Sequence, residues 1–176
     1  MVVDPNGFQP DCPSFLRWAG SKRGLLPILQ SFWKPSDKRY LEPFAGSACL
    51  FFALRPPRAV LGDLNSDLIS TYLELKYRVT DVVEQLALLP NPGKEEYLRL
   101  RTLDPKVLAR AERAARFIYL NRFCFNGIYR TNLQGRFNVP FSGQRCGVVP
   151  GATILTQCAS SPCLNPSFSD RRQNQK

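Results

Sequence analysis

The chain has 176 residues, of which 44% are apolar, which is enough for one domain or for part of a larger one. Its 24 lysines and arginines against 14 acids give a formal net charge of +10. This excess favours a polyanionic partner, most simply nucleic acid, although charge can also serve solubility alone. No apolar run reaches the roughly 20 residues that span a bilayer, and residues 1–9 lack a signal-peptide pattern. We therefore expect a soluble, intracellular protein of the cytoplasm.

The positions of the charged and sulfur-containing residues narrow the classes of function. Between Lys94 and Arg145 there are 11 basic and 4 acidic residues, and after Glu112 the only acid is Asp170. This clustering favours a binding surface. The six cysteines form no C-x-x-C pair and the sequence has no histidine, so we expect no metal site and no histidine-based nucleophilic catalysis. A disulfide framework is not expected in a chain of this size without a secretion signal.

The first half of the chain alternates helices and short strands. Residues 1–13 are proline-rich and predict an irregular leader. The patterns then predict a helix (22–33), a strand (39–42) and a glycine loop that leads into a helix (43–54). A second strand (59–61) and a helix capped by Asn65 (66–77) follow. This order is typical of the start of a doubly wound α/β fold.

The second half has a different character. Residues 80–120 predict helix throughout, with Asp104 as a cap and a charged stripe of Lys106, Arg110 and Arg113 that is either solvated or binding. Turn signals at 126–127 and 134–135 predict a hairpin or a pair of loops over 121–143. From Cys146 onward periodicity is lost, so residues 146–176 are expected to form an irregular tail.

The strand–loop–helix after residue 39 could hold a cofactor. Gly46, Ser47 and Ala48 allow close approach to the backbone at a helix N-terminus. Asp63, at the end of the next strand and 21 residues after Glu42, is placed to bind the ribose hydroxyls of an adenosine cofactor. By itself the pattern is better explained by a tight turn and a capping aspartate. The full G-x-G-x-x-G pattern is absent, which disfavours a dinucleotide.

Four blocks together resemble a known family. They are Phe15–Lys22 (F-L-R-W-A-G-S-K), Leu41–Ser47 (L-E-P-F-A-G-S), Gly62–Ile69 (G-D-L-N-S-D-L-I) and Phe117–Phe141, which contains Y-L-N-R-F-C-F-N-G-I-Y-R and ends in F-N-V-P-F. In order and spacing they resemble the N-terminal part of Dam-type DNA adenine N6-methyltransferases over roughly residues 15–143. The resemblance implies an S-adenosylmethionine-dependent, Rossmann-like α/β core that is incomplete, with a helical DNA-recognition insertion. Residues 14–79 would form the cofactor-binding part and 80–145 the target-recognition part.

The resemblance implies a site for S-adenosylmethionine. Trp18 and Lys22 would pack against and contact the cofactor, Asp63 would bind its ribose, and the loop around its methionine part would be formed by Glu42, Phe44 and Gly46. Ala48 stands where the family often has a further glycine, which would tighten the approach to the loop.

The resemblance also implies double-stranded DNA as the partner, at GATC-like sites. Arg130 would read a guanine edge, and Phe125 and Asn126 would occupy the space left by an extruded base. The remaining predicted contacts are to thymine methyl groups, by Ile128 and Pro140, and to phosphates or bases, by Arg17, Arg122 and Arg136. For each of these residues hairpin packing or a plain surface charge is the competing interpretation.

The motif that holds the target amine in such enzymes, D-P-P-Y or a relative of it, is not found in the sequence. Asn165-Pro166-Ser167-Phe168 matches it only superficially. We therefore expect a chain truncated before this motif and inactive alone, with no catalytic residues of its own, which a missing C-terminal half would complete. A non-catalytic DNA-binding fragment is the alternative. Absent central strands would leave a sheet edge unpaired.

Overall fold

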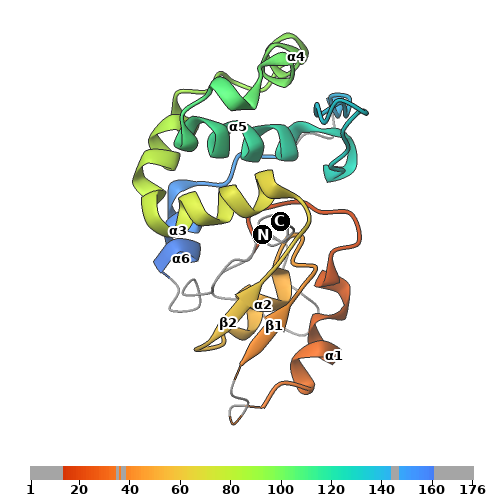
Figure 1. Cartoon of the computed structure of the whole chain (residues 1–176), viewed down its shortest axis with the longest axis vertical. Helices are drawn as coiled ribbons and strands as arrows, with labels where there is room; N and C mark the ends of the chain where they lie inside the picture. The colour runs from red at the N-terminus through yellow and green to blue at the C-terminus, as the bar shows by residue number, and fades with distance from the viewer. Residues whose placement is uncertain (1–13, 35, 37–38, 144–146, 161–176) are drawn as a thin grey trace, which may run out of the picture.

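The computed structural model describes residues 14–34, 36, 39–143 and 147–160. Within them it has a two-stranded parallel sheet and six α-helices. Figure 1 shows the strands with α1 and α2 in its lower part and α3, α4 and α5 above them, with α6 beside α3. The predicted leader, residues 1–13, lies outside the described residues. The chain is thus of mixed α/β class, as expected.

The sheet pairs β1 (Tyr40–Glu42) with β2 (Ala59–Leu61) in parallel, with Tyr40 opposite Ala59 and Glu42 opposite Leu61. Side chains alternate across a strand, so Tyr40 and Glu42 are buried while Leu41 is exposed. The buried face is covered by α2, whose Phe51 ring lies 6.3 Å from that of Tyr40 between centroids. The face of Leu41 is open in the described part of the chain.

The two short helices, α1 and α2, lie within the predicted ranges 22–33 and 43–54. A 3-10 turn (Lys22–Leu25) leads into α1 (Leu26–Ser31), with Pro27 in the first turn, where a missing N–H costs nothing. The second helix, α2, spans Cys49–Leu54, and the buried Ala48 before it has φ +50°. An L residue pays a steric cost in this left-handed region, which gives a reason why a glycine suits the position.

The long helix α3 (Ser66–Ala87) joins the sheet to the upper helices. The Asn65 side chain caps it by accepting hydrogen bonds from the backbone N–H groups of Asp67 and Leu68. Arg78, inside it, has non-helical angles. The boundary that we predict between the cofactor-binding part and the target-recognition part, between residues 79 and 80, falls inside this helix, close to that kink.

The prediction of continuous helix over residues 80–120 is wrong. After α3 the chain leaves helical geometry at Pro90, Pro92 and Gly93, because proline lacks the N–H that a helix interior requires. Helix α4 (Lys94–Thr102) follows, then a 3-10 turn (Pro105–Val107) with the Asp104 carboxylate as its cap, and then α5 (Arg110–Phe123).

Residues 124–143 form an irregular hairpin. Two isolated antiparallel bridges, Cys124 with Phe141 and Thr131 with Phe137, hold its arms. The Asn132 side chain closes its turn by accepting from the N–H groups of Gln134 and Arg136.

The expectation of an irregular tail after Cys146 is wrong for residues 152–160, which form α6 (Ala152–Ser160). Leu155 and Cys158, one turn apart, are fully buried in the main core with residues of α3. Burial of this short apolar stripe against α3 overrides a weak local pattern. Residues 161–176, which include the N-P-S-F segment, lie outside the described residues.

No helix in the described ranges is both long and apolar enough to cross a membrane. Among the same residues no cluster of three or more Cys, Asp or Glu side chains is arranged to hold a metal ion.

Candidate functional site

The carboxylate of Asp63 joins the ends of the two strands. Its Oδ2 accepts from the backbone N–H of Gly46 at 3.0 Å, and its Oδ1 accepts from that of Asn65 at 2.9 Å. The hydroxyl of Tyr72, on α3, donates to the carbonyl of Gly46 at 2.7 Å. Burial raises the pKa of Tyr72, so the phenol stays a neutral donor. The loop after β1 is therefore held at the carboxyl edge of the sheet from two sides.

A second set of polar contacts lies beside this loop. The ammonium of Lys22 donates to Glu42 Oε1 at 2.9 Å and to the carbonyl of Phe44 at 3.1 Å. Tyr40 donates to the other oxygen of Glu42 at 2.8 Å, and burial together with the Glu42 carboxylate raises the pKa of Tyr40. The buried Glu42 charge is thus compensated by one cation and one hydroxyl. An ammonium has three N–H donors, and these contacts use two.

Trp18 covers the glycine of the loop. A Cβ built on Gly46 would lie 2.7 Å from Cδ1 and 3.0 Å from Nε1 of Trp18, and Gly46 has φ +51°. Both the space and the backbone conformation therefore require glycine here. The indole also stacks on Tyr129, with 6.0 Å between ring centroids and 18° between planes.

Two adjoining hollows open at this edge. The smaller, of about 210 Å³, is lined by five of the six predicted cofactor residues: Trp18, Lys22, Phe44, Gly46 and Asp63. Glu42, the sixth, does not line the hollow but accepts a hydrogen bond from Lys22, which does. The larger, of about 530 Å³, lies between the start of α3 and the hairpin, with Asp67, Ile128 and Tyr129 in its wall. Trp18, Ala19 and Asp63 line both hollows, so the two adjoin at a shared wall.

Arg17, predicted to bind DNA, is tied to the base of the hairpin. Its backbone N–H and C=O both pair with the Asn121 amide, at 2.9 Å and 2.6 Å. A Cβ on Gly127 would lie 2.5 Å from the Cβ of Arg17, so the two backbones touch. The guanidinium of Arg17 donates to the carbonyl of Arg122, and Nε of Arg122 donates to the carbonyl of Val148. Burial and the nearby charges of Arg17 and Arg23 lower the pKa of Arg122.

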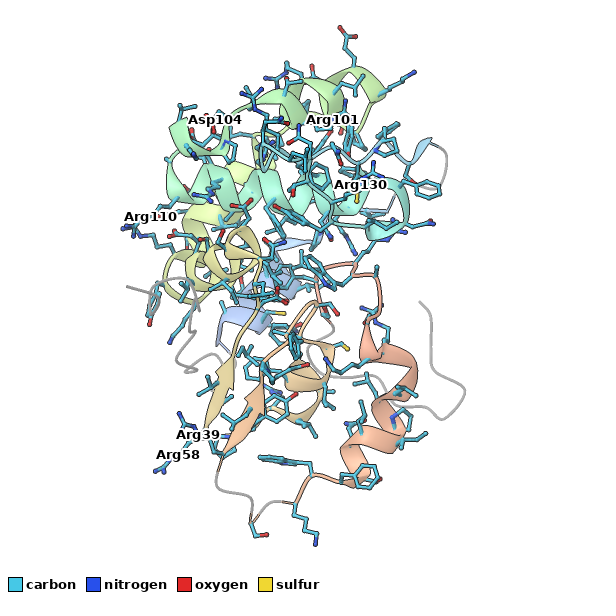
Figure 2. The ribbon with its side chains drawn as sticks, turned by 45° about the vertical axis from the view of Figure 1, so that its right-hand side comes forward. Arg39, Arg58, Arg101, Asp104, Arg110 and Arg130 are labelled. Atoms are coloured by element: carbon cyan, nitrogen blue, oxygen red, sulfur yellow. The ribbon has the colours of Figure 1, made fainter. Side chains whose placement is uncertain are left out.

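The other predicted DNA contacts are spread along the hairpin. Arg130 is exposed, with Nε donating to Asn138 Oδ1 at 2.9 Å, and lies on the right-hand side in Figure 2. Phe125 is half exposed, and Asn126 has φ +53°. Ile128 faces the larger hollow, and the exposed Pro140 accepts from the N–H of Phe125 through its carbonyl. Arg136 lies at the exposed turn. The structure thus gathers the cofactor set at one hollow but spreads the DNA set over a longer surface.

The sequence analysis missed the contacts of Asp67 that join the two regions, and it missed the buried cation Arg116, which joins α5 to α4. Asp67 accepts hydrogen bonds from Arg113 and from the Tyr129 hydroxyl. Arg116 is buried and donates to the carbonyls of Leu100 and Arg101, at 2.7 Å and 2.9 Å, and burial lowers its pKa. Asp67 is the second acid of the D-L-N-S-D block, and this was the one available signal. The spacing of Arg113, Arg116 and Tyr129 along the chain carried no signal of these contacts.

The chain matches the model of the D12 class N6 adenine-specific DNA methyltransferase family over residues 18–145. It therefore belongs to this family, and the resemblance found in the sequence is confirmed.

Three relatives illustrate the match. The type II methyltransferase M1.LlaDCHI of Lactococcus lactis subsp. cremoris is 40% identical over an aligned length of 132 residues, and the match covers 72% of this chain and 46% of that protein. The DNA adenine methylase of Escherichia coli (strain K12) is 37% identical over 144 residues, 80% of this chain and 51% of the methylase. The type II methyltransferase M.MjaIII of Methanocaldococcus jannaschii is 33% identical over an aligned length of 147 residues, and the match covers 72% of this chain and 51% of that protein. The chain spans about half the length of the curated relatives it matches.

The contact between Trp18 and Gly46 predicts the effect of a methyl group. Gly46→Ala should lower the free energy of unfolding by about 1–3 kcal/mol, because the left-handed backbone and the indole both oppose a Cβ. Denaturant unfolding measures this change, and tryptophan emission should shift as the indole is displaced. Gly24→Ala is the matched control: nothing lies within 4 Å of its Cβ position, so stability should change by less than about 0.5 kcal/mol. Equal stability of the two variants would contradict the packing described.

Proposed function

We propose that this chain supplies the S-adenosylmethionine site and the DNA-recognition surface of a site-specific DNA adenine N6-methyltransferase. The observation that carries the proposal is the gathering of the predicted cofactor residues at one hollow at the carboxyl edge of β1 and β2. Ligands of open α/β sheets bind at this edge. In this proposal residues 14–79 form the cofactor-binding part of a Rossmann-like core and residues 80–145 the target-recognition part.

The residues at the hollow fit the cofactor by their remaining donors and acceptors. A carboxylate has about four lone-pair sites, and Asp63 uses two, so it can still accept from ribose hydroxyls. Lys22 keeps one N–H for the cofactor carboxylate. The smaller hollow alone is below the roughly 300–1,000 Å³ of small-molecule sites, whereas with the adjoining larger one it is within that range. When bound, the cofactor supplies an electrophilic methyl group.

The hairpin fits duplex DNA by its charged side chains. Arg130 is exposed and oriented by Asn138, and its terminal nitrogens can form the two parallel bonds that a guanine edge accepts. Arg17 and Arg122 lie together at the hairpin base, where a bound phosphate would offset the repulsion between these neighbouring cations. The net charge of +10 supports such a surface.

The role of Asp63 predicts a loss of cofactor affinity. Asp63→Asn should weaken S-adenosylmethionine binding about 10-fold or more, because hydrogen bonds to a charged acceptor contribute about 1.5–3 kcal/mol. Isothermal titration calorimetry with the 176-residue chain measures the change. Asp104→Asn is the matched control, since it removes the same charge from an exposed cap remote from the hollow. Similar affinities in both variants would remove Asp63 from the site.

The role of Arg130 predicts a sequence-dependent loss. Arg130→Ala should cost about 1–3 kcal/mol on a GATC-containing duplex and relax the preference at one base pair, as expected for a lost bidentate contact. Fluorescence anisotropy with duplexes altered one pair at a time measures this. Arg58→Ala removes an equal charge at the opposite end of the molecule, visible in Figure 2, and should leave the preference unchanged. Equal loss on every duplex, with a smaller salt slope, would make Arg130 a phosphate contact.

We further propose that the 176-residue chain binds cofactor and duplex without transferring the methyl group. The target amine must be held at the sulfonium methyl, where misplacement by about 1 Å costs on the order of 100-fold in rate. The sequence contains no D-P-P-Y segment for this purpose. Transfer of labelled methyl from S-adenosylmethionine to duplex DNA should therefore stay at the level without protein. Turnover above that level would contradict this proposal, and turnover abolished by Asn165→Ala would assign the holding role to Asn165.

A further inference from the structure

Tyr129 stands where the cofactor hollow meets the recognition hairpin. Its ring stacks on Trp18 and also contacts Phe117 and Phe137, with centroid distances of 6.0, 5.6 and 5.4 Å. Its hydroxyl donates to Asp67 Oδ2 at 2.9 Å. The residue is therefore held on its faces by aromatic rings and at its tip by a carboxylate, and it lines the larger hollow.

The carboxylate that holds Tyr129 is itself fixed. Asp67 lies in the first turn of α3, four residues after Asp63, where negative charge is favoured by the helix dipole. Its Oδ1 accepts from Nε and Nη2 of Arg113, on α5. The hairpin, α3 and α5 thus meet at one carboxylate, and the hydroxyl of Tyr129 has a rigid acceptor.

The other neighbour of Tyr129 is the indole that covers the cofactor loop. Trp18 touches Gly46 closely enough to exclude a Cβ there, yet Trp18 belongs to a segment without regular secondary structure. Contacts from outside that segment must therefore set the position of the indole. Its described ring contacts are with Tyr129 and Phe117, and the ring of Tyr129 is the more nearly parallel, at 18° against 31°.

We propose that Tyr129 is a positioning residue for the cofactor site: it holds the Trp18 indole against Gly46 while Asp67 holds Tyr129. The inference rests on the proposed function and deepens it, because a hairpin residue between Ile128 and Arg130 then sets the affinity of the cofactor site through the position of Trp18. The ring carries the effect through its contacts with Trp18, Phe117 and Phe137, and the hydroxyl bond to Asp67 adds only a smaller restraint on the ring.

Two substitutions separate the ring from the hydroxyl. Tyr129→Leu removes the ring but keeps an apolar side chain, and it should weaken S-adenosylmethionine binding about 3- to 10-fold, the scale of a lost aromatic pair. Tyr129→Phe keeps the ring and should bind within about twofold of the unaltered chain. Val139→Ala is the control for lost stability, because Val139 is buried in the same hairpin but belongs to the core cluster around Tyr97 and Phe123. Its cofactor affinity should be unchanged. Calorimetric titration with S-adenosylmethionine supplies the three affinities.

A second measurement follows the indole without any cofactor. In a Trp33→Phe background Trp18 is the only tryptophan, so acrylamide quenching reports its accessibility alone. Quenching should rise in Tyr129→Leu and stay near the unaltered value in Tyr129→Phe and Val139→Ala.

The outcomes separate the inference from the function on which it rests. If the unaltered chain binds S-adenosylmethionine and Tyr129→Leu binds it equally well, the inference is overturned and the proposed function stands. If Val139→Ala loses as much affinity as Tyr129→Leu, the effect is one of general stability and the inference is again overturned. If the unaltered chain binds no S-adenosylmethionine, the proposed function fails and the inference falls with it, whatever the quenching shows.

Discussion

The hydrogen bonds of the Asp63 carboxylate are the constraint on which the rest of the site depends. One oxygen holds the loop after β1 at Gly46, and the other holds the chain as it enters α3 at Asn65. A sheet of two strands has little hydrogen bonding of its own, so a side chain that joins the ends of both strands replaces part of what neighbouring strands would supply. The hydroxyl of Tyr72, on α3, donates a hydrogen bond to the carbonyl of Gly46 and completes the same connection. The position of the loop is thereby tied to the helix that carries the upper half of the molecule.

That upper half is held together by polar groups that lie inside it. The Asn121 amide pairs with both backbone groups of Arg17, which fixes an N-terminal segment to the base of the hairpin. The buried Arg116 guanidinium satisfies carbonyls at the end of α4, where helices leave C=O groups without partners. A buried charge satisfied by several acceptors is costly to replace, since removal of either side leaves unpaired polar groups. Part of the basic excess is therefore structural, and the exposed arginines such as Arg130 are the ones left for a polyanion.

The two proposed binding regions share walls. Trp18 and Asp63 line both hollows, and the larger one is bounded on its far side by residues of the hairpin. A cofactor at the loop and a duplex at the hairpin would thus lie on either side of a small group of aromatic rings. The face of β1 that carries Leu41 is open in the described residues.

The sequence by itself determined the elements whose signals are local. The strands at residues 40–42 and 59–61, the Asn65 cap and the family match all follow from short patterns, as does the nearness of Gly46 to Asp63, because parallel strands end at a common edge. The end of the helix before α4, at Pro90 and Pro92, is a local signal that the sequence analysis overlooked. Only the tertiary structure decided that Leu155 and Cys158 complete a buried helix. It alone brought Asp67 to Arg113 and Tyr129, which are 46 and 62 residues away in the chain. Such contacts form when whole elements pack, because burial and long-range pairing depend on which surfaces meet, and no window of neighbouring residues contains that information.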